Sequence, residues 1–394
     1  MEKKKSIFNS LIFKLILGIV VGIIIGLIAN EPVISVFIAL KSILSQLINY
    51  CVPLIILGFI TPAIINLKES AGKILSVTLI ICYISSVGAA LMSMLAGYSI
   101  IPKLNIGKAA SETAKSLPES LFALEIQPII PVMTALVTSI LIGLAILWTK
   151  SVTLEKVFNE FNNVVLFIVD KFVINILPFF IATTFATLAY EGDIIYQLPV
   201  FFKIIIIVVI GHFIWMTLLY TMGGLFSKTN PKEVFKNYPP AYLTAMGTMS
   251  SAATLPVALK CARKSKTLDP GIIDFVIPIC SNTHLCGSVL TEVFFVMTVS
   301  QILYGKLPAI GTMITFILLL GIFGIAAPGV PGGTVVASLG LIISIVGFND
   351  AGTALMLSIF ALQDSFGTAC NITGDGAIAL IVTGIFKKVP KQQK

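Results

Sequence analysis

The chain has 394 residues, of which 57% are hydrophobic and 11% are charged, and its formal net charge is +8. Soluble domains carry about 25% charged residues, so this composition excludes a soluble globular protein and indicates a polytopic membrane protein. The lysines lie between apolar runs and form no patch, so we assign them a topological role and expect no nucleic-acid partner.

The apolar runs predict eight membrane-spanning helices, since each span needs about 20 residues. The first run follows the lysines at 3–5 but lacks a small-residue cleavage site, which favours a retained helix over a signal peptide. The polar stretch 103–119 predicts a flexible loop. The expected spans are approximately 8–28, 33–67, 75–101, 126–148, 157–190, 198–226, 272–303 and 354–386.

Two further segments do not have the pattern of plain spans. The segment Tyr238 to Leu259 is rich in Gly, Ser, Thr and Pro, and the segment Ala309 to Val346 is broken by a Pro-Gly run at 328–333. Non-helical backbone survives at membrane depth only where it is buried in protein or lines a cavity. We therefore predict two re-entrant helical hairpins. The alternative is that these small residues only permit close helix packing.

The loop lysines test this topology. We assume eight spans and two hairpins, each hairpin entering and leaving the membrane on the same side. Most of the loop lysines then share one side, which the positive-inside rule assigns to the cytoplasm. Both termini are then cytoplasmic in a cell membrane. The lysines in the loop at 103–119 fall outside and run against the rule. Those on the inner side lie at 3–5, 68, 73, 150, 156, 228–236, 260–266 and 387–394.

A row of polar residues interrupts the last apolar run. Asp364, Thr368, Asn371 and Asp375 are spaced i, i+4, i+7 and i+11, which places them on one face of a helix. An ionisable residue costs about 2.5 kcal/mol or more at the centre of a membrane helix. One such aspartate is consistent with a structural pair, whereas a whole polar face favours a solute or cation site. Together with the two predicted hairpins, such a site indicates a secondary transporter.

The six cysteines have no paired spacing and mostly lie in apolar runs. They predict small buried side chains rather than a disulfide or zinc framework. The two histidines form no metal-binding pair and no nucleophile-and-base motif, which disfavours an intramembrane enzyme. A channel would need no ligand for an amino group. We therefore expect a transporter, not an enzyme, without a cofactor.

Three stretches resemble the dicarboxylate/amino acid:cation symporter family, the glutamate-transporter homologues. They are Ser250 to Pro256 at the first hairpin tip, Gly329 to Gly333 at the second tip, and Asp364 to Asp375, whose Asn-Ile-Thr-Gly-Asp run is the sharpest. The resemblance extends over nearly the whole chain. It implies an all-α, glutamate-transporter-like membrane protein with about eight transmembrane helices and two re-entrant helical hairpins.

The resemblance also implies a homotrimer within the lipid bilayer, in which a transport part moves against a fixed scaffold. In a single polytopic domain, residues 1–68 and 119–192 would form the scaffold and residues 69–118 and 193–394 the transport part. Asp364 would hold the substrate amino group and Asn371 its α-carboxylate. The substrate set is completed by Ser250, Ser251, Ser288, Val330 and Thr368.

The cation site departs from the family pattern. Where the family usually reads Asn-Met-Asp-Gly-Thr, this chain has His284-Leu285-Cys286-Gly287-Ser288, so a carboxylate is replaced by a thiol, a poor sodium ligand. His284 is a candidate proton-titrating group or a neutral substitute for asparagine. One sodium site is thus in doubt. The other would persist at Asp375 with backbone carbonyls near Cys280, His284 and Asn371.

The substrate prediction depends on arginine. Acidic-substrate members of the family grip the side-chain carboxylate with an arginine, but the matching positions here hold Gly367 and Met249, and the only arginine is Arg263. We expect uptake of a small neutral amino acid of the serine, threonine or alanine class, coupled to sodium, with protons as a further candidate. The alternative is a dicarboxylate or acidic amino acid, such as aspartate or glutamate.

Overall fold

The computed structural model describes residues 11–65, 72–104, 117–121, 124–192, 194–327, 329 and 331–386, and its regular elements there are all helices. Six continuous helical segments among these residues are long and apolar enough to cross a membrane. The predicted all-α membrane fold is confirmed. The first ten residues, the loop at 105–116 and the C-terminal lysines at 387–394 lie outside the described residues.

The predicted spans correspond to long helices or to helices joined end to end. A short π-helical segment, η3, joins α5 to α6 within one span of 40 residues. The helices of the predicted spans are α1 (Leu11–Ile28), α2 (Glu31–Ile65), α3 (Gly72–Ile100) continued by η2 (Ile101–Leu104), α4 (Val132–Thr149), α5 (Val152–Ile168), η3 (Val169–Val173), α6 (Ile174–Glu191), α7 (Ile194–Ser227), α11 (Pro270–Thr283), α12 (Cys286–Tyr304) and α15 (Asp350–Phe386).

Both predicted hairpins are helix pairs. The first consists of α9 and α10 and the second of α13 and α14, the latter extended by a π-helical segment. Positive φ angles of 52° at Met249 and 70° at Gly332 lie beside the turns. The remaining elements are α8 (Lys232–Phe235), α9 (Pro239–Thr248), α10 (Ser251–Ala262), α13 (Ile310–Ala326), α14 (Gly333–Leu341) and η4 (Ile342–Val346).

Two spans differ from their prediction. The seventh is not one helix, because α11 ends at Thr283 and α12 begins at Cys286, with extended backbone at His284. Four polar residues in a row, Ser281 to His284, mark this break in the sequence, and the prediction of one continuous span passed over them. The fourth span begins at Val132 rather than near 126, because Pro131 is the N-cap of α4.

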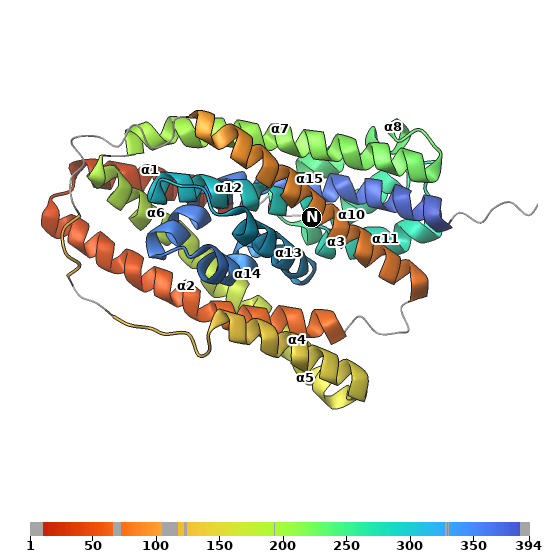
Figure 1. Ribbon diagram of the computed structural model, residues 1–394, viewed down its shortest axis with the longest axis horizontal. Helices are drawn as coiled ribbons and strands as arrows, with labels where there is room; N and C mark the ends of the chain where they lie inside the picture. Colours follow the sequence, from red (N-terminus) through yellow and green to blue (C-terminus); the bar gives the residue numbers. More distant parts are fainter. Residues whose placement is uncertain are drawn as a thin grey trace, which may run out of the picture.

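Helices α1, α2, α4, α5 and α6 form one packed group. Helix α1 runs along α6, and α2 packs against α4, α5 and α6; Figure 1 shows α4 and α5 together at the lower edge beside α2. Glycines 18, 22 and 26 of α1 face the α6 backbone, where an added Cβ would lie 2.6, 2.3 and 2.2 Å from carbonyl oxygens of Pro178, Ala182 and Ala186. Such small residues allow two membrane helices to approach closely.

The second group surrounds α15. This helix packs against α7, α9, α11 and α12, while α3 runs along α12 and α13; α7 lies along the upper edge in Figure 1. Nearly every residue of α12 and α15 is buried. A helix that is buried on all sides and still carries polar residues places those residues inside the protein and away from lipid.

Candidate functional site

The tips of the two hairpins touch each other. Ser250 is the N-cap of α10, and its Oγ accepts a hydrogen bond from the backbone N–H of Ala253 at 3.2 Å. The same hydroxyl donates to the carbonyl oxygen of Gly329 at 2.6 Å. A capping serine satisfies one of the free N–H groups of the first helical turn. Here it also fixes the second tip over the first.

Asp364 lies directly against the second tip. Its side chain is 3% exposed, and Oδ2 accepts a hydrogen bond of 2.6 Å from the backbone N–H of Gly332. Thr368, one helical turn further on, lies 3.5 Å from Oδ1. A buried carboxylate is costly unless hydrogen bonds or an opposite charge compensate it. These two donors are neutral, so neither of them balances the charge of an ionised carboxylate.

Asn371 joins α15 to the start of α12. Its Oδ1 accepts hydrogen bonds from the backbone N–H groups of Gly287 at 2.7 Å and Ser288 at 3.2 Å. Its Nδ2 donates to Ser288 Oγ at 2.9 Å. The amide therefore acts as a cap for a helix more than 80 residues away. Because an amide nitrogen has two hydrogens, one donor remains for a ligand.

Asp375 and His284 form a buried pair. His284 Nδ1 lies 2.9 Å from Asp375 Oδ1, and both side chains are completely buried. The other ring nitrogen, Nε2, lies 2.8 Å from Ser85 Oγ of α3. Among the described residues, Asp375 Oδ2 has no hydrogen-bond partner. One oxygen of this carboxylate is therefore engaged by histidine, and the other, called open below, is buried without a hydrogen-bond partner.

Thiols surround this pair. All six cysteines are buried, as the sequence predicted, and Cys82 Sγ lies 3.6 Å from Cys280 Sγ. In the described part of the chain, no three His, Cys, Asp or Glu side chains converge as a group that could hold a metal ion. The Cys280 carbonyl, expected near a cation, accepts the backbone N–H of His284 at 2.8 Å.

The predicted site residues thus fall into two neighbouring clusters on α15. The tips, Asp364 and Thr368 form the first cluster, and Ser288, Asn371, His284 and Asp375 form the second. Ser251 is buried in the first turn of α10, and Val330 lies outside the described residues.

Two further groups of buried polar side chains in these helices lie outside the sequence motifs. Ser338 of α14 donates a hydrogen bond to Glu292 of α12, both fully buried. Gln363, next to Asp364, is fully buried, and its amide atoms have no partner among the described residues. A glutamine inside an apolar run is a signal that the sequence did contain. The backbone N–H of Gly332, by contrast, leaves no signature in a sequence.

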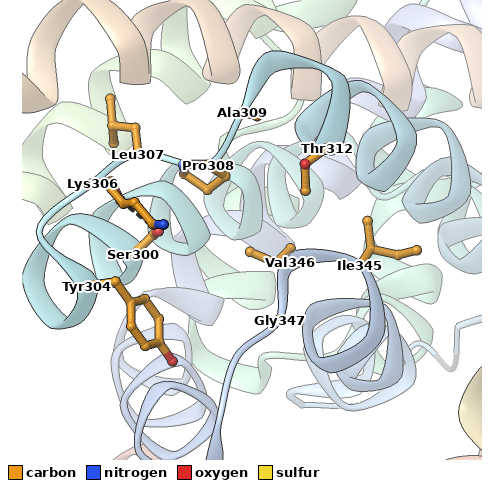
Figure 2. Close-up of a pocket in the computed structure, with 10 residues that line it drawn as sticks. All are labelled: Ser300, Tyr304, Lys306, Leu307, Pro308, Ala309, Thr312, Ile345, Val346 and Gly347. Carbon is orange, nitrogen blue, oxygen red and sulfur yellow. Dashed lines mark hydrogen bonds between the residues drawn. The ribbon is translucent and has the colours of Figure 1, made fainter.

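A cavity of about 520 Å³ lies elsewhere, where α12 leads into α13. Figure 2 shows Ser300, Lys306 and Thr312 around it, with Val346 from the far end of the second hairpin. It contains none of the predicted site residues. The cavity therefore borders both stems of the second hairpin and is separate from the polar clusters at its tip.

Known proteins resemble this chain in sequence over stretches of different length. The sodium:dicarboxylate symporter family model matches residues 11–385. Human excitatory amino acid transporter 2 is 29% identical over 192 residues, covering 48% of this chain and 33% of that protein. Mouse excitatory amino acid transporter 3 is 31% identical over 166 residues, covering 42% and 31%.

A relative whose name refers to a different substrate matches over a longer stretch. Bovine neutral amino acid transporter A is 25% identical over 260 residues, covering 64% of this chain and 48% of that protein. The matched stretches thus span from about a third to about half of the relatives' own lengths. By the match along its length, this multi-pass membrane protein belongs to the sodium:dicarboxylate symporter family, a family of sodium-coupled transporters and not of enzymes.

Proposed function

We propose that this protein is a secondary active symporter that takes up a small neutral amino acid together with sodium. The observation that carries the proposal is the convergence of Asp364 with both hairpin tips inside the protein. A carboxylate there matches a substrate ammonium, because a charge-assisted hydrogen bond is about twice as strong as a neutral one. The free donor of Asn371 would serve the α-carboxylate.

The preference for a neutral side chain rests on charge. The only arginine, Arg263, is exposed and donates to Asp274 at 2.6 Å, so it is engaged away from the site. Next to Thr368 the chain has Gly367. A Cβ added to this glycine would lie 3.4 Å from Ser288. A substrate carboxylate without a partner would bear its desolvation cost unpaired.

The second candidate substrate is an acidic amino acid or dicarboxylate. Two findings favour it: the family is named after sodium and dicarboxylates, and two of the relatives are excitatory amino acid transporters. A helix N-terminus can compensate an anion without any arginine, and α10 and α14 both begin at hairpin tips. We rank this candidate second because the only arginine, Arg263, lies away from the site.

For the cation, we propose that sodium binds at the open Oδ2 of Asp375, with backbone oxygens of the break near Cys280 and His284 and of Asn371. The freed carbonyls of interrupted membrane helices coordinate sodium in secondary transporters. A carboxylate and carbonyls are the hard oxygen ligands that such a cation prefers. Protons are the further candidate coupling ion.

For the movement, we propose that α1, α2 and α4 to α6 form a scaffold against which α3, α7 to α15 and the hairpins shift. Each of these two helix groups packs more extensively within itself than against the other, which supports this division. We further propose a homotrimer in the cytoplasmic membrane with both termini in the cytoplasm, on the positive-inside argument from the loop lysines.

Uptake into proteoliposomes tests the proposal. Labelled serine, threonine, alanine, aspartate, glutamate and succinate are offered separately, with a sodium gradient or a proton gradient imposed alone. We expect uphill accumulation of a neutral amino acid that needs the sodium gradient. High-affinity accumulation of aspartate or succinate that neutral amino acids do not inhibit would establish the second candidate instead. Downhill flux without saturation would contradict a transporter of either kind.

A further inference from the structure

The imidazole of His284 bridges two helices that are distant in the chain. It lies at the break between α11 and α12, where the backbone of His284 leaves the helical conformation. From this point Nδ1 reaches Asp375 of α15 at 2.9 Å, and Nε2 reaches Ser85 of α3 at 2.8 Å. Because a carboxylate accepts, Nδ1 carries the hydrogen and donates it. Both ring nitrogens are thus satisfied, one from each side.

The ring fills the space between Ser85 and Asp375. The His284 side chain is 0% exposed, and Ser85 is only 5% exposed. Helix α15 makes room for the ring with a glycine, since a Cβ on Gly374 would lie 2.9 Å from His284 Cε1 and 3.3 Å from Cys286 Sγ. The contact is therefore tight.

The surrounding atoms suit a histidine better than a hard cation. Sodium is bound by several oxygens, whereas thiols are soft ligands. The groups nearest the ring include Cys286, and the Cys82 and Cys280 thiols lie 3.6 Å apart in the helices that supply Ser85 and His284. The two oxygens that contact the ring, Ser85 Oγ and Asp375 Oδ1, are each engaged by a ring nitrogen.

We propose that His284 is a built-in replacement for a coupling cation: its imidazole fills the position between the Ser85 hydroxyl and the Asp375 carboxylate, two oxygens that would otherwise be available to a cation. The protein then binds no cation at that position, and sodium enters only at the open Oδ2 side of Asp375. This inference rests on the proposed sodium coupling for its functional meaning. Its structural content, that no cation binds beside Ser85, stands by itself.

The first experiment counts sodium ions on the purified protein. The melting temperature is measured against sodium concentration, with choline chloride holding ionic strength constant, because a ligand that binds only the folded state stabilises it by mass action. A His284→Asn, Cys286→Asp double variant removes the ring and supplies an oxygen ligand. Its melting temperature should rise more steeply with sodium concentration, by the amount that one additional bound sodium ion produces. An unchanged dependence in a folded double variant contradicts the proposal.

His212 provides the matched control. It is the other buried histidine, and its Nε2 lies 3.0 Å from the carbonyl oxygen of Gly287 and 2.9 Å from Thr291 Oγ1. His212→Asn should lower the melting temperature without altering the number of sodium ions. An equal gain of one ion in this control would mean that the effect comes from loosening the fold, which also overturns the proposal.

The second experiment uses the unmodified chain, so it does not depend on the variants folding. Crystals are grown in sodium and soaked in thallium, a monovalent cation located by anomalous scattering. We expect no peak within coordination distance of Ser85 Oγ. A peak there overturns the proposal. Because neither experiment uses a substrate, failure of amino-acid uptake in proteoliposomes would count against the proposed function and leave these readings intact.

Discussion

Ser250 Oγ donates a 2.6 Å hydrogen bond to the carbonyl oxygen of Gly329, joining hairpin tips that are 79 residues apart in the chain. The same hydroxyl is the N-cap of α10. One side chain therefore both begins a helix and holds the second tip in contact with the first. In a transporter that encloses its substrate, breaking this contact should affect entry and exit.

Ser250→Ala removes the cap and the link between the tips. Loss of a cap costs about 1 kcal/mol, and loss of a hydrogen bond a further 0.5–1.5 kcal/mol, approximately. We expect weaker substrate binding by about tenfold, measured by concentration-dependent uptake. Ser151→Ala is the control, since Ser151 caps α5, a helix of the other packed group. Equal effects of both variants would assign the loss to capping alone.

Asp364→Asn tests the proposed ammonium ligand. A hydrogen bond to a charged group is worth about 1.5–3 kcal/mol, so affinity should fall by roughly tenfold or more. Substrate-induced shifts in melting temperature would measure it without requiring transport. Asp274→Asn, which removes an exposed carboxylate paired with Arg263, should leave affinity unchanged. Near-normal binding by Asp364→Asn would remove this residue from the site.

Asp375→Asn tests the proposed cation ligand. Asparagine keeps an oxygen for His284 but removes the charge, so the sodium concentration for half-maximal uptake should rise by about tenfold or more. Asp170→Asn, at an exposed carboxylate 2.8 Å from Lys171, is the control. If Asp375 serves only as the partner of His284, the variant should instead lose folded protein, because breaking a buried pair is strongly destabilising.

Gly367→Arg tests the substrate class. A Cβ at this position would lie 3.4 Å from Ser288, an ordinary contact, so the first atom of a side chain fits there. The added guanidinium should let aspartate compete with neutral amino acids in uptake assays, since it pairs bidentately with carboxylates. Gly367→Met adds similar volume without charge and should not. Strong aspartate transport by the unmodified protein would show that some other group compensates the carboxylate.

Gly22→Ala tests the contact between α1 and α6. Its Cβ would lie 2.3 Å from the carbonyl oxygen of Ala182, so the helices must separate. Overpacking of this kind costs about 1–3 kcal/mol, and we expect a lower melting temperature. Gly311→Ala in α13 is the control, because nothing lies within 4 Å of its added Cβ. It should be neutral or slightly stabilising.

The sequence predicted the spans and hairpins because hydropathy and helix-breaking residues are local signals. The prediction missed the break at His284, because a hydropathy window of span length averages over the four polar residues at 281–284. Nor could the sequence reveal the partners of the site residues. Ser85 and His284 are 199 residues apart, and the donor to Asp364 is a backbone N–H of Gly332. Such contacts depend on how helices pack, which no periodicity specifies. The roles of the predicted site residues in transport stay predictions.

The burial of all six native cysteines has a practical consequence for spectroscopy. A thiol introduced at an exposed position should react with a water-borne maleimide long before the native thiols do, so the wild-type background can serve for labelling. Lys156 of α5 and Lys264 beyond α10 are both exposed and belong to different helix groups. Paired dyes at these two positions would report, molecule by molecule, whether the distance between the groups changes with each transport cycle.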